Sequence, residues 1–219
     1  MKIHIRGGRL IDPKGGIDGQ RDIFIAAGKV GAIGEAPADF HANRVIDACG
    51  LVVCPGLVDL SARLREPGLE YMATLESEMH AAVAGGVTSL VCPPDTDPPL
   101  DEPGLVEMLR HRAKNLHQAR VFPLGALTQK LEGQRLTEMA ELHDAGCIAF
   151  SQADAPLTDT NVLLRAMQYV ELSAPGDRDA LEVALNLLNT ALGTEQPNAA
   201  LGTLPIQRDL ADLRTLIGT

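Results

Sequence analysis

Aromatic residues are scarce in this 219-residue sequence, which has no tryptophan and an aromatic content of 3%. A hydrophobic core must therefore be built mainly from Leu, Val, Ile and Ala. Net positive charge is lacking too: the formal net charge is −10, which argues against nucleic acid and an anionic membrane surface as partners. No apolar run reaches the ~18 residues that span a bilayer, and the N-terminus shows no secretory signal pattern. We expect a cytoplasmic protein.

Several common site patterns are missing as well. The four cysteines include no Cys-x-x-Cys pair, so a zinc ribbon is not expected. Cys54, Cys92 and Cys147 lie in or beside predicted strands, which favours reduced core thiols. No Walker-type glycine loop is present, and no serine lies in a nucleophile-elbow pattern.

The chain divides by pattern into three regions. Residues 1–51 contain short strand-like segments separated by turn signals, among them Asp12–Gly16, and they predict a small β-sandwich. From residue 52 strands alternate with helices, which predicts four βα units of a parallel (β/α) barrel at 52–170. The expected strands begin at 52, 87, 120 and 147, and the expected helices cover 70–84, 101–116, 136–144 and 160–170.

Residues 171–219 contain two amphipathic segments, 179–192 and 206–217, which predict a helical tail of unclear origin. A closed eight-unit barrel needs about 250 residues, more than the chain offers from residue 52. The fold class expected is therefore α/β: a β-sandwich, the first half of a TIM-type barrel and a helical tail. The open edges of such a half-barrel would be covered by the tail or by another chain, or the chain is a truncated fragment.

Residues 51–68, with the sequence LVVCPGLVDLSARLREPG, are the most informative stretch. Pro55 and Gly56 break an apolar run, and a second run ends on Asp59. From Asp59 to Arg65 every second residue is polar, which in an extended chain places these side chains on one face. Carboxyl ends of barrel strands are where such folds carry their chemistry.

This stretch resembles the metal-site signature of the amidohydrolase superfamily, in its dihydroorotase and allantoinase branch. Residues 55–59 and 64–68 match the framing residues, and weaker resemblance extends over about 1–170. At the positions of the family's two metal-binding histidines this chain has Ser61 and Arg63. A serine hydroxyl is a poor zinc ligand, and a guanidinium has no lone pair to offer. We therefore expect no catalytic residue, no bound zinc and no other cofactor.

Two interpretations of these altered positions remain open. Arg63 could replace the positive charge of the metal and pair with Asp59 or another carboxylate of the site. Alternatively, Ser61 and Arg63 changed after catalytic function had been lost.

Two loops extend the resemblance. Residues 92–96 stand where dihydroorotases have Met-Pro-Asn-Thr, and Asp95 replaces an Asn that, in the family, holds the substrate carboxylate together with an arginine equivalent to Arg65. Arg65 and Asp95 are therefore the vestigial substrate-binding residues. Arg65 suits a bidentate carboxylate contact, but pairing with Asp95 to hold the loop is the slightly preferred interpretation.

The second loop, residues 145–154, resembles a family segment in which an Asp after the Ser serves the metal site. Gln152 occupies that position here and is the third altered metal-site residue. Asp154 is one residue late, and a shift of one residue changes the face of a strand.

Three functional hypotheses follow. The first is an inactive dihydroorotase homologue of pyrimidine biosynthesis; the resemblance implies that such homologues associate with aspartate carbamoyltransferase, in an oligomer. The second is an active zinc-dependent cyclic-amide hydrolase with an atypical site. The third is a truncated product without a function of its own.

Overall fold

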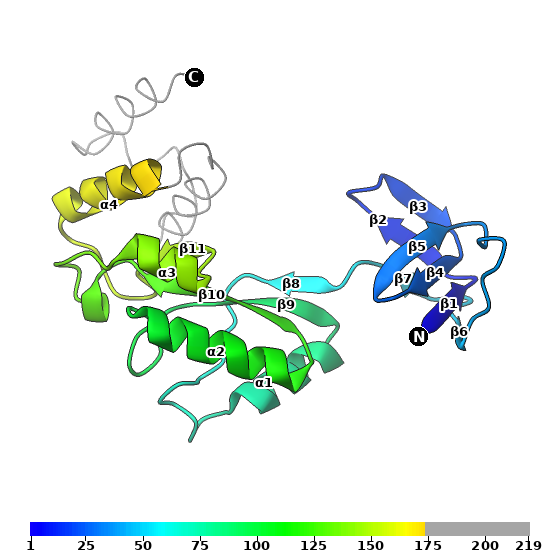
Figure 1. The fold of residues 1–219 in the computed structure, drawn as a ribbon, viewed down its shortest axis with the longest axis horizontal. Coiled ribbons are helices and arrows are strands. Elements are labelled where there is room, and N and C mark those ends of the chain that lie inside the picture. The colour runs from blue at the N-terminus through cyan, green and yellow to red at the C-terminus, as the bar shows by residue number, and fades with distance from the viewer. Residues whose placement is uncertain (174–219) are drawn as a thin grey trace. The chain divides into compact units, whose positions relative to one another are not determined.

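The computed structural model describes residues 1–173, in which the chain forms two compact units that divide between Gly56 and Leu57 (Figure 1). The two helices predicted at 179–192 and 206–217 lie outside the described residues. Within those residues, no helix combines the length and apolar character required to cross a membrane.

The N-terminal unit consists of two small sheets, with strand orders β5-β4-β1-β6 and β3-β2-β7. Ala27 and Gly28 have positive φ values of 51° and 75°, as the tight hairpin turn between β4 and β5 requires. Leu10, Ile23 and Phe24 are its buried apolar residues along the strands. The strands are β1 (Lys2–Arg6), β2 (Arg9–Asp12), β3 (Ile17–Gln20), β4 (Ile23–Ala26), β5 (Lys29–Ile33), β6 (Arg44–Asp47) and β7 (Val52–Val53).

Strand β7 differs from the expectation that the barrel begins at residue 52. Val52 pairs with Arg9 of β2, so this short strand belongs to the N-terminal unit. Pro55 and Gly56 separate two apolar runs, and each run joins a different sheet. The division of the chain at Gly56 therefore lies a few residues later than the predicted boundary at residue 51.

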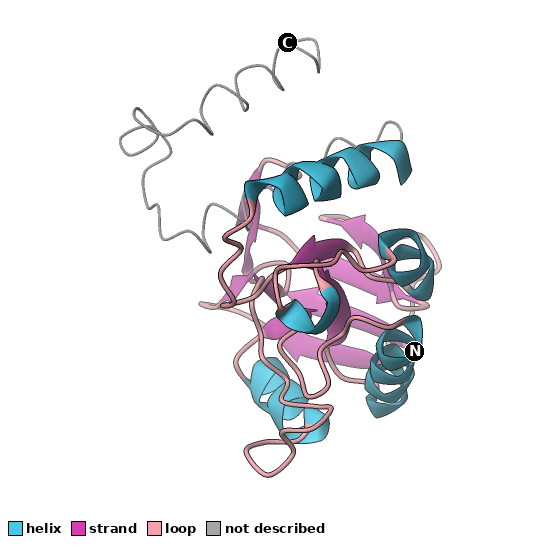
Figure 2. Ribbon diagram, turned by 90° about the vertical axis from the view of Figure 1, so that its left-hand side faces the viewer, coloured by secondary structure: helices cyan, strands magenta, loops and turns pink. Residues whose placement is uncertain are grey.

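The second unit contains a curled half-barrel of parallel strands in the order β11-β10-β9-β8. Helices connect successive strands, as parallel pairing requires, and Figure 2 distinguishes these helices from the strands by colour. The structure thus confirms the predicted partial barrel. Its elements are β8 (Leu57–Asp59), α1 (Leu75–Ala84), β9 (Val87–Cys92), α2 (Pro103–Leu116), β10 (Arg120–Ala126), a 3-10 turn η1 (Gln129–Leu131), α3 (Met139–Ala145), β11 (Ala149–Ser151) and α4 (Thr160–Ser173).

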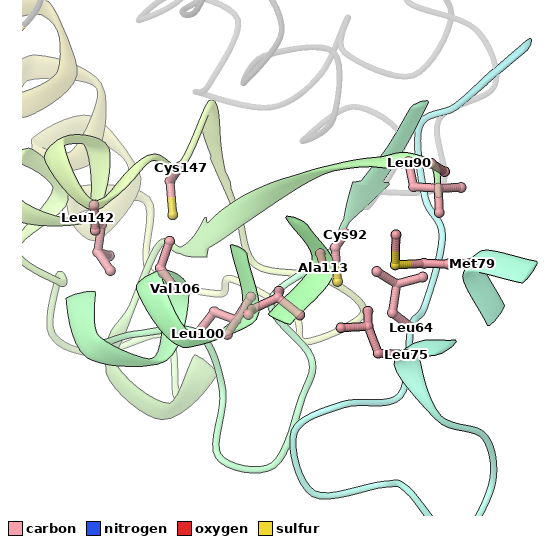
Figure 3. Packing of buried hydrophobic residues seen from close by; sticks show 13 residues of the cluster. Leu64, Leu75, Met79, Leu90, Cys92, Leu100, Val106, Ala113, Leu142 and Cys147 are labelled. Carbon is pink, nitrogen blue, oxygen red and sulfur yellow. The ribbon is translucent and has the colours of Figure 1, made fainter. Parts of the chain in front are cut away.

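The main core of this unit lies between the strands and the helices. Leu90 and Cys92 of β9 are buried with residues of α1 and α2 (Figure 3). Val91, on the opposite face of the same strand, belongs to a separate small cluster. Residues of the main cluster include Leu64, Leu75, Met79, Leu100, Val106, Ala113, Leu142 and Cys147.

Two helix starts differ from the sequence expectation. Helix α1 begins at Leu75 rather than near residue 70, because Thr74 and Ser77 form a reciprocal capping box. Helix α2 begins at Pro103 with Glu102 at its N-cap. Asp101 instead accepts a hydrogen bond from the backbone N–H of Lys130 at 2.8 Å.

All four cysteines have free thiols. Burial raises the pKa of the Cys92 thiol to about 11 and that of Cys147 to about 12, so both are neutral at physiological pH. Cys54 is exposed, which corrects the expectation of a core thiol: it lies in the segment between β7 and β8.

Candidate functional site

Three polar residues from three segments of the half-barrel meet in one cluster. Arg63 follows β8, Asp95 follows β9 and Asp154 follows β11. Because the carboxyl ends of parallel strands lie at the same edge of a sheet, residues distant in sequence come together there. This cluster is the candidate functional site.

The guanidinium of Arg63 bridges the two carboxylates. Its Nε donates to Asp95 Oδ2 at 2.5 Å, and its Nη2 donates to Asp154 Oδ2 at 2.7 Å. Hydrogen bonding to Asp95 raises the pKa of the Arg63 guanidinium above its ordinary value. The side chains of Arg63 and Asp95 are 29% and 26% exposed, whereas that of Asp154 is 88% exposed. The bond to Asp95 is therefore the better shielded of the two.

Asp59 has a different role from the one considered for it. Its Oδ1 accepts a hydrogen bond from the backbone N–H of Ser61 at 2.9 Å, so it stabilises the turn after β8 rather than pairing with Arg63. The strand itself ends at Asp59, and Arg65 has a φ of 62°. The expected extended alternation from Asp59 to Arg65 is therefore wrong, because the backbone leaves the strand conformation.

Arg65 does not pair with Asp95, so the preferred interpretation of that residue is corrected. The carboxylate of Asp95 is taken by Arg63. Within residues 1–173 no ion pair or side-chain hydrogen bond involves Arg65, while its backbone carbonyl accepts from Leu69 N at 2.9 Å. Arg65 is half-buried, and the alternative role, contact with a carboxylate of a ligand, stays a prediction.

Gln152 is buried in a neutral hydrogen-bond network. Its Nε2 donates to Thr128 Oγ1 at 2.8 Å, and the same hydroxyl lies 3.0 Å from Gln152 Oε1. The hydroxyl also accepts from the backbone N–H of Gly133 at 2.9 Å. Both side chains are nearly inaccessible, at 3% and 0% exposure. Thr128 was not anticipated from the sequence, and no spacing pattern points to it.

Asp154 reaches the site although it comes late in the loop. Ala153 adopts a left-handed conformation, with φ of 49°, and its N–H donates to Ser151 Oγ at 3.0 Å. This turn interrupts the alternation of the strand, so counting faces from β11 does not predict the direction of Asp154. The resemblance to the family segment at Gln152 therefore did not identify Asp154 as part of the site.

Glu66 connects the loop after β8 to helices α1 and α2. Its carboxylate is buried at 2% exposure, accepts from the backbone N–H of Leu75 at 3.0 Å and forms an ion pair with Arg112. The acidic residue of the signature thus fixes the start of α1. Its structural role was not anticipated from the sequence.

The residues at the three altered positions do not fit a zinc ion. Zinc takes imidazole, thiolate or carboxylate ligands, whereas Ser61, Arg63 and Gln152 supply a hydroxyl, a cation and an amide. The carboxylates of Asp95 and Asp154 are already paired with Arg63. Across the described part of the chain, no group of three or more His, Cys, Asp or Glu residues is placed to hold a metal ion.

Comparison with known proteins identifies the family of this chain. The model of the family described as "Dihydro-orotase-like" matches residues 50–175. A "Dihydroorotase-like protein" of Pseudomonas aeruginosa is 48% identical over 169 residues, covering 77% of this chain and 40% of the relative. A "Dihydroorotase" of Trichlorobacter lovleyi is 42% identical over 169 residues, with the same coverage.

A solved structure agrees with these matches at the level of the fold. The L-hydantoinase of Arthrobacter aurescens superposes with a TM-score of 0.65 at 24% identity, over 78% of this chain and 38% of that one. The chain spans 40% of the length of the curated relatives it matches. On the family match over residues 50–175, the chain belongs to the dihydro-orotase-like family.

Proposed function

We propose that this protein is a non-catalytic dihydroorotase homologue of pyrimidine biosynthesis. The observation that carries the proposal is the Arg63 guanidinium, which bridges Asp95 and Asp154 where the family signature has a metal ligand. A fixed guanidinium neutralises carboxylates as a metal would, but it cannot bind a water molecule as a ligand and lower its pKa. The cluster therefore suits a structural role in the loops better than hydrolysis.

The neutral network of Gln152 and Thr128 supports the same conclusion. A metal-site carboxylate would need a cation beside it, since a buried unpaired charge is costly. An amide whose oxygen and nitrogen both pair with a threonine hydroxyl needs none. The neutral side chain of Gln152 is therefore compatible with a site that holds no metal.

The partner that we propose is the catalytic chain of aspartate carbamoyltransferase, in the cytoplasm. The support is the resemblance of residues 51–68 to dihydroorotases, together with the family match. In this role the protein contributes a binding surface to the assembly and no chemical step.

Zinc content and hydrolysis test the proposed loss of catalysis. We expect a zinc content far below one per chain in purified protein and no measurable hydrolysis of dihydroorotate. The double variant S61H/R63H should remain inactive, because Gln152 still stands at the third metal position. Zinc near one per chain, with hydrolysis that a chelator abolishes, would establish the active cyclic-amide hydrolase instead.

Light scattering after size exclusion tests the proposed partner. The chain would be run alone and mixed with the aspartate carbamoyltransferase of the same organism. We expect a mixed complex of defined mass. Separate elution of two unassociated particles contradicts the partner role, and aggregation in both runs favours a fragment without a function of its own.

A further inference from the structure

The first and last strands of the half-barrel each have a free side within residues 1–173. In this range β8 pairs only with β9, and β11 pairs only with β10. The pairings of the half-barrel are all parallel, so the free side of β11 is complementary to the free side of β8 in a parallel ladder. A barrel closes when its last strand pairs with its first in this way.

Apolar side chains are exposed at both free sides. Leu57 and Val58 of β8 are 55% and 59% exposed, and Ile148, directly before β11, is 46% exposed. Because successive residues of a strand face opposite sides, β8 lacks cover on both of its faces. The strands of a closed parallel barrel are covered on both faces. β8 therefore has the side chains of an inner strand in the position of an edge strand.

The strand pairings show which of these side chains face the barrel interior. Val58 pairs with Ser89, and Val91, two residues further along β9, lies on the same face as Ser89. Val91 and Ala149 of β11 belong to the small cluster on the side of the sheet away from the main core. Val58 and Ala149 thus face the interior of the barrel.

The same pairings fix how far β11 is displaced along the strand direction relative to β8. Asp59 of β8 is level with Leu90 of β9, and Leu90 is level with Val121 of β10. Ala149 of β11 is level with Leu124, which lies three residues beyond Val121. Ala149 is therefore displaced by three residues from the level of Asp59.

This displacement determines the neighbours that closure brings together. Eight-stranded barrels of this class have a shear of about eight residues, and half of the barrel accounts for about four of them. Moving back by that amount from the level of Ala149 leads to Val58 of a second copy. Ile148 then lies beside Leu57, and both face the helices because each directly precedes an interior residue. The two pairs match in face and in apolar character.

We propose that two copies of this chain close one eight-stranded parallel barrel about a two-fold axis. A half-turn about the barrel axis places β11 of each copy beside β8 of the other, which gives the two identical contacts of a symmetric dimer. Leu57 and Ile148 cover each other at each contact. Helix α4 follows β11, and a right-handed crossover places such a helix over the next strand, here β8 of the second copy. The carboxyl ends of all the strands lie at one end of the barrel, so the candidate functional sites of both copies lie there.

Direct pairing of β8 with β8 of a second copy fits these observations less well. A two-fold axis between identical strands makes them antiparallel, unlike the pairs of the half-barrel. It also leaves β11 without a neighbour and Ile148 exposed. Closure uses both free sides at once, and it does not depend on whether the candidate functional site is catalytic.

Disulfide cross-linking of the full chain tests the proposed neighbours. Cys49 and Cys54 are exposed, so every variant also carries C49S/C54S. L57C and I148C are purified separately, mixed under reducing conditions and then oxidised. Adjacent strands lie within disulfide range, so we expect linked dimer in the mixture and none in either variant alone.

Val83 provides the matched control, because on α1 it is 46% exposed, as Ile148 is. V83C mixed with L57C should give no linked dimer. Linked dimer in L57C alone would show pairing of β8 with β8, and equal linkage of L57C with V83C would show random collision. Either result overturns the proposal, as does the absence of linked dimer in the mixture of L57C with I148C.

Light scattering after size exclusion measures the size of the assembly. The parent and V83K should approach twice the chain mass of 23.3 kDa as concentration rises and go no further, because the dimer uses both free sides. I148K should stay near the mass of one chain, since an ammonium buried at the contact is costly. Circular dichroism checks folding, and I148S replaces I148K if that variant is unfolded. A parent chain that stays monomeric, or whose mass rises beyond the dimer, contradicts closure.

Discussion

The side chain of Arg63 connects its own loop to two others. Its own segment follows β8, and its two partners follow β9 and β11. Because the guanidinium is planar and carries several donors, it can bond two carboxylates at once in a fixed geometry. A point charge such as a lysine ammonium would not hold both in the same arrangement.

Replacing Arg63 by Met should therefore reduce stability. The half-buried Asp95 would lose its charged partner, and we expect the free energy of unfolding to fall by about 1–2 kcal/mol. Asp154 is 88% exposed, so D154N should change stability by less than about 0.5 kcal/mol. Urea unfolding of the three proteins measures both effects, and equal losses in the two variants would contradict the greater importance of Asp95.

The sequence was sufficient to identify the altered metal positions but not the partners of Arg63. None of the side chains of Ser61, Arg63 and Gln152 is a good zinc ligand in any fold. The residue before Asp154, Ala153, has a positive φ value, so the pairing of Arg63 with Asp154 could not be read from the alternation of the strand. Such left-handed conformations are uncommon for residues with a Cβ, and no local pattern in the sequence signals them.

At the scale of the element, the loop from Leu64 to Gly68 connects the site to the start of α1. Glu66 fixes that helix through its bond to Leu75 N. Gly68 has a φ of 91°, and a Cβ built there would clash with the backbone carbonyl of Asp97. The backbone of this loop therefore packs against the loop after β9 at a distance only glycine permits.

A pair of glycine substitutions tests this packing. G68A should destabilise the protein by about 2 kcal/mol or more, because the methyl group meets a backbone carbonyl and the conformation is strained. G104A lies in helix α2, where an added Cβ meets nothing within 4 Å, and it should be neutral or stabilising by up to about 1 kcal/mol. Thermal unfolding compares the two; similar midpoints would argue against the close approach at Gly68.

Periodicity in the sequence identified the elements more reliably than their ends. The apolar run Val87–Cys92 is strand β9 as predicted, because a strand buried on both faces leaves a continuous apolar signal. Helix α1 starts later than its pattern suggests, since Thr74 and Ser77 cap it. Strand β7 pairs with β2 of the N-terminal unit, because Pro55 and Gly56 separate it from the apolar run that forms β8.

At the scale of the whole molecule, the half-barrel has an unpaired edge among the residues that the structure describes. β8 lies last in the strand order β11-β10-β9-β8, and no strand within residues 1–173 pairs with its second edge. Leu57, Val58 and Leu60 are 55%, 59% and 66% exposed. An apolar edge strand of this kind favours association with another chain; the oligomer expected from the sequence stays a prediction.

A charge on this edge should therefore suppress self-association of the isolated chain. V58K places an ammonium on β8, where it opposes edge-to-edge pairing. V83K adds the same charge on α1, at a residue that is 46% exposed, without altering the edge. Static light scattering over a concentration series should show the parent and V83K increasing in mass while V58K stays near 23.3 kDa. If both variants suppress association equally, net charge rather than the β8 edge controls it, and a parent chain that remains monomeric throughout contradicts an open edge.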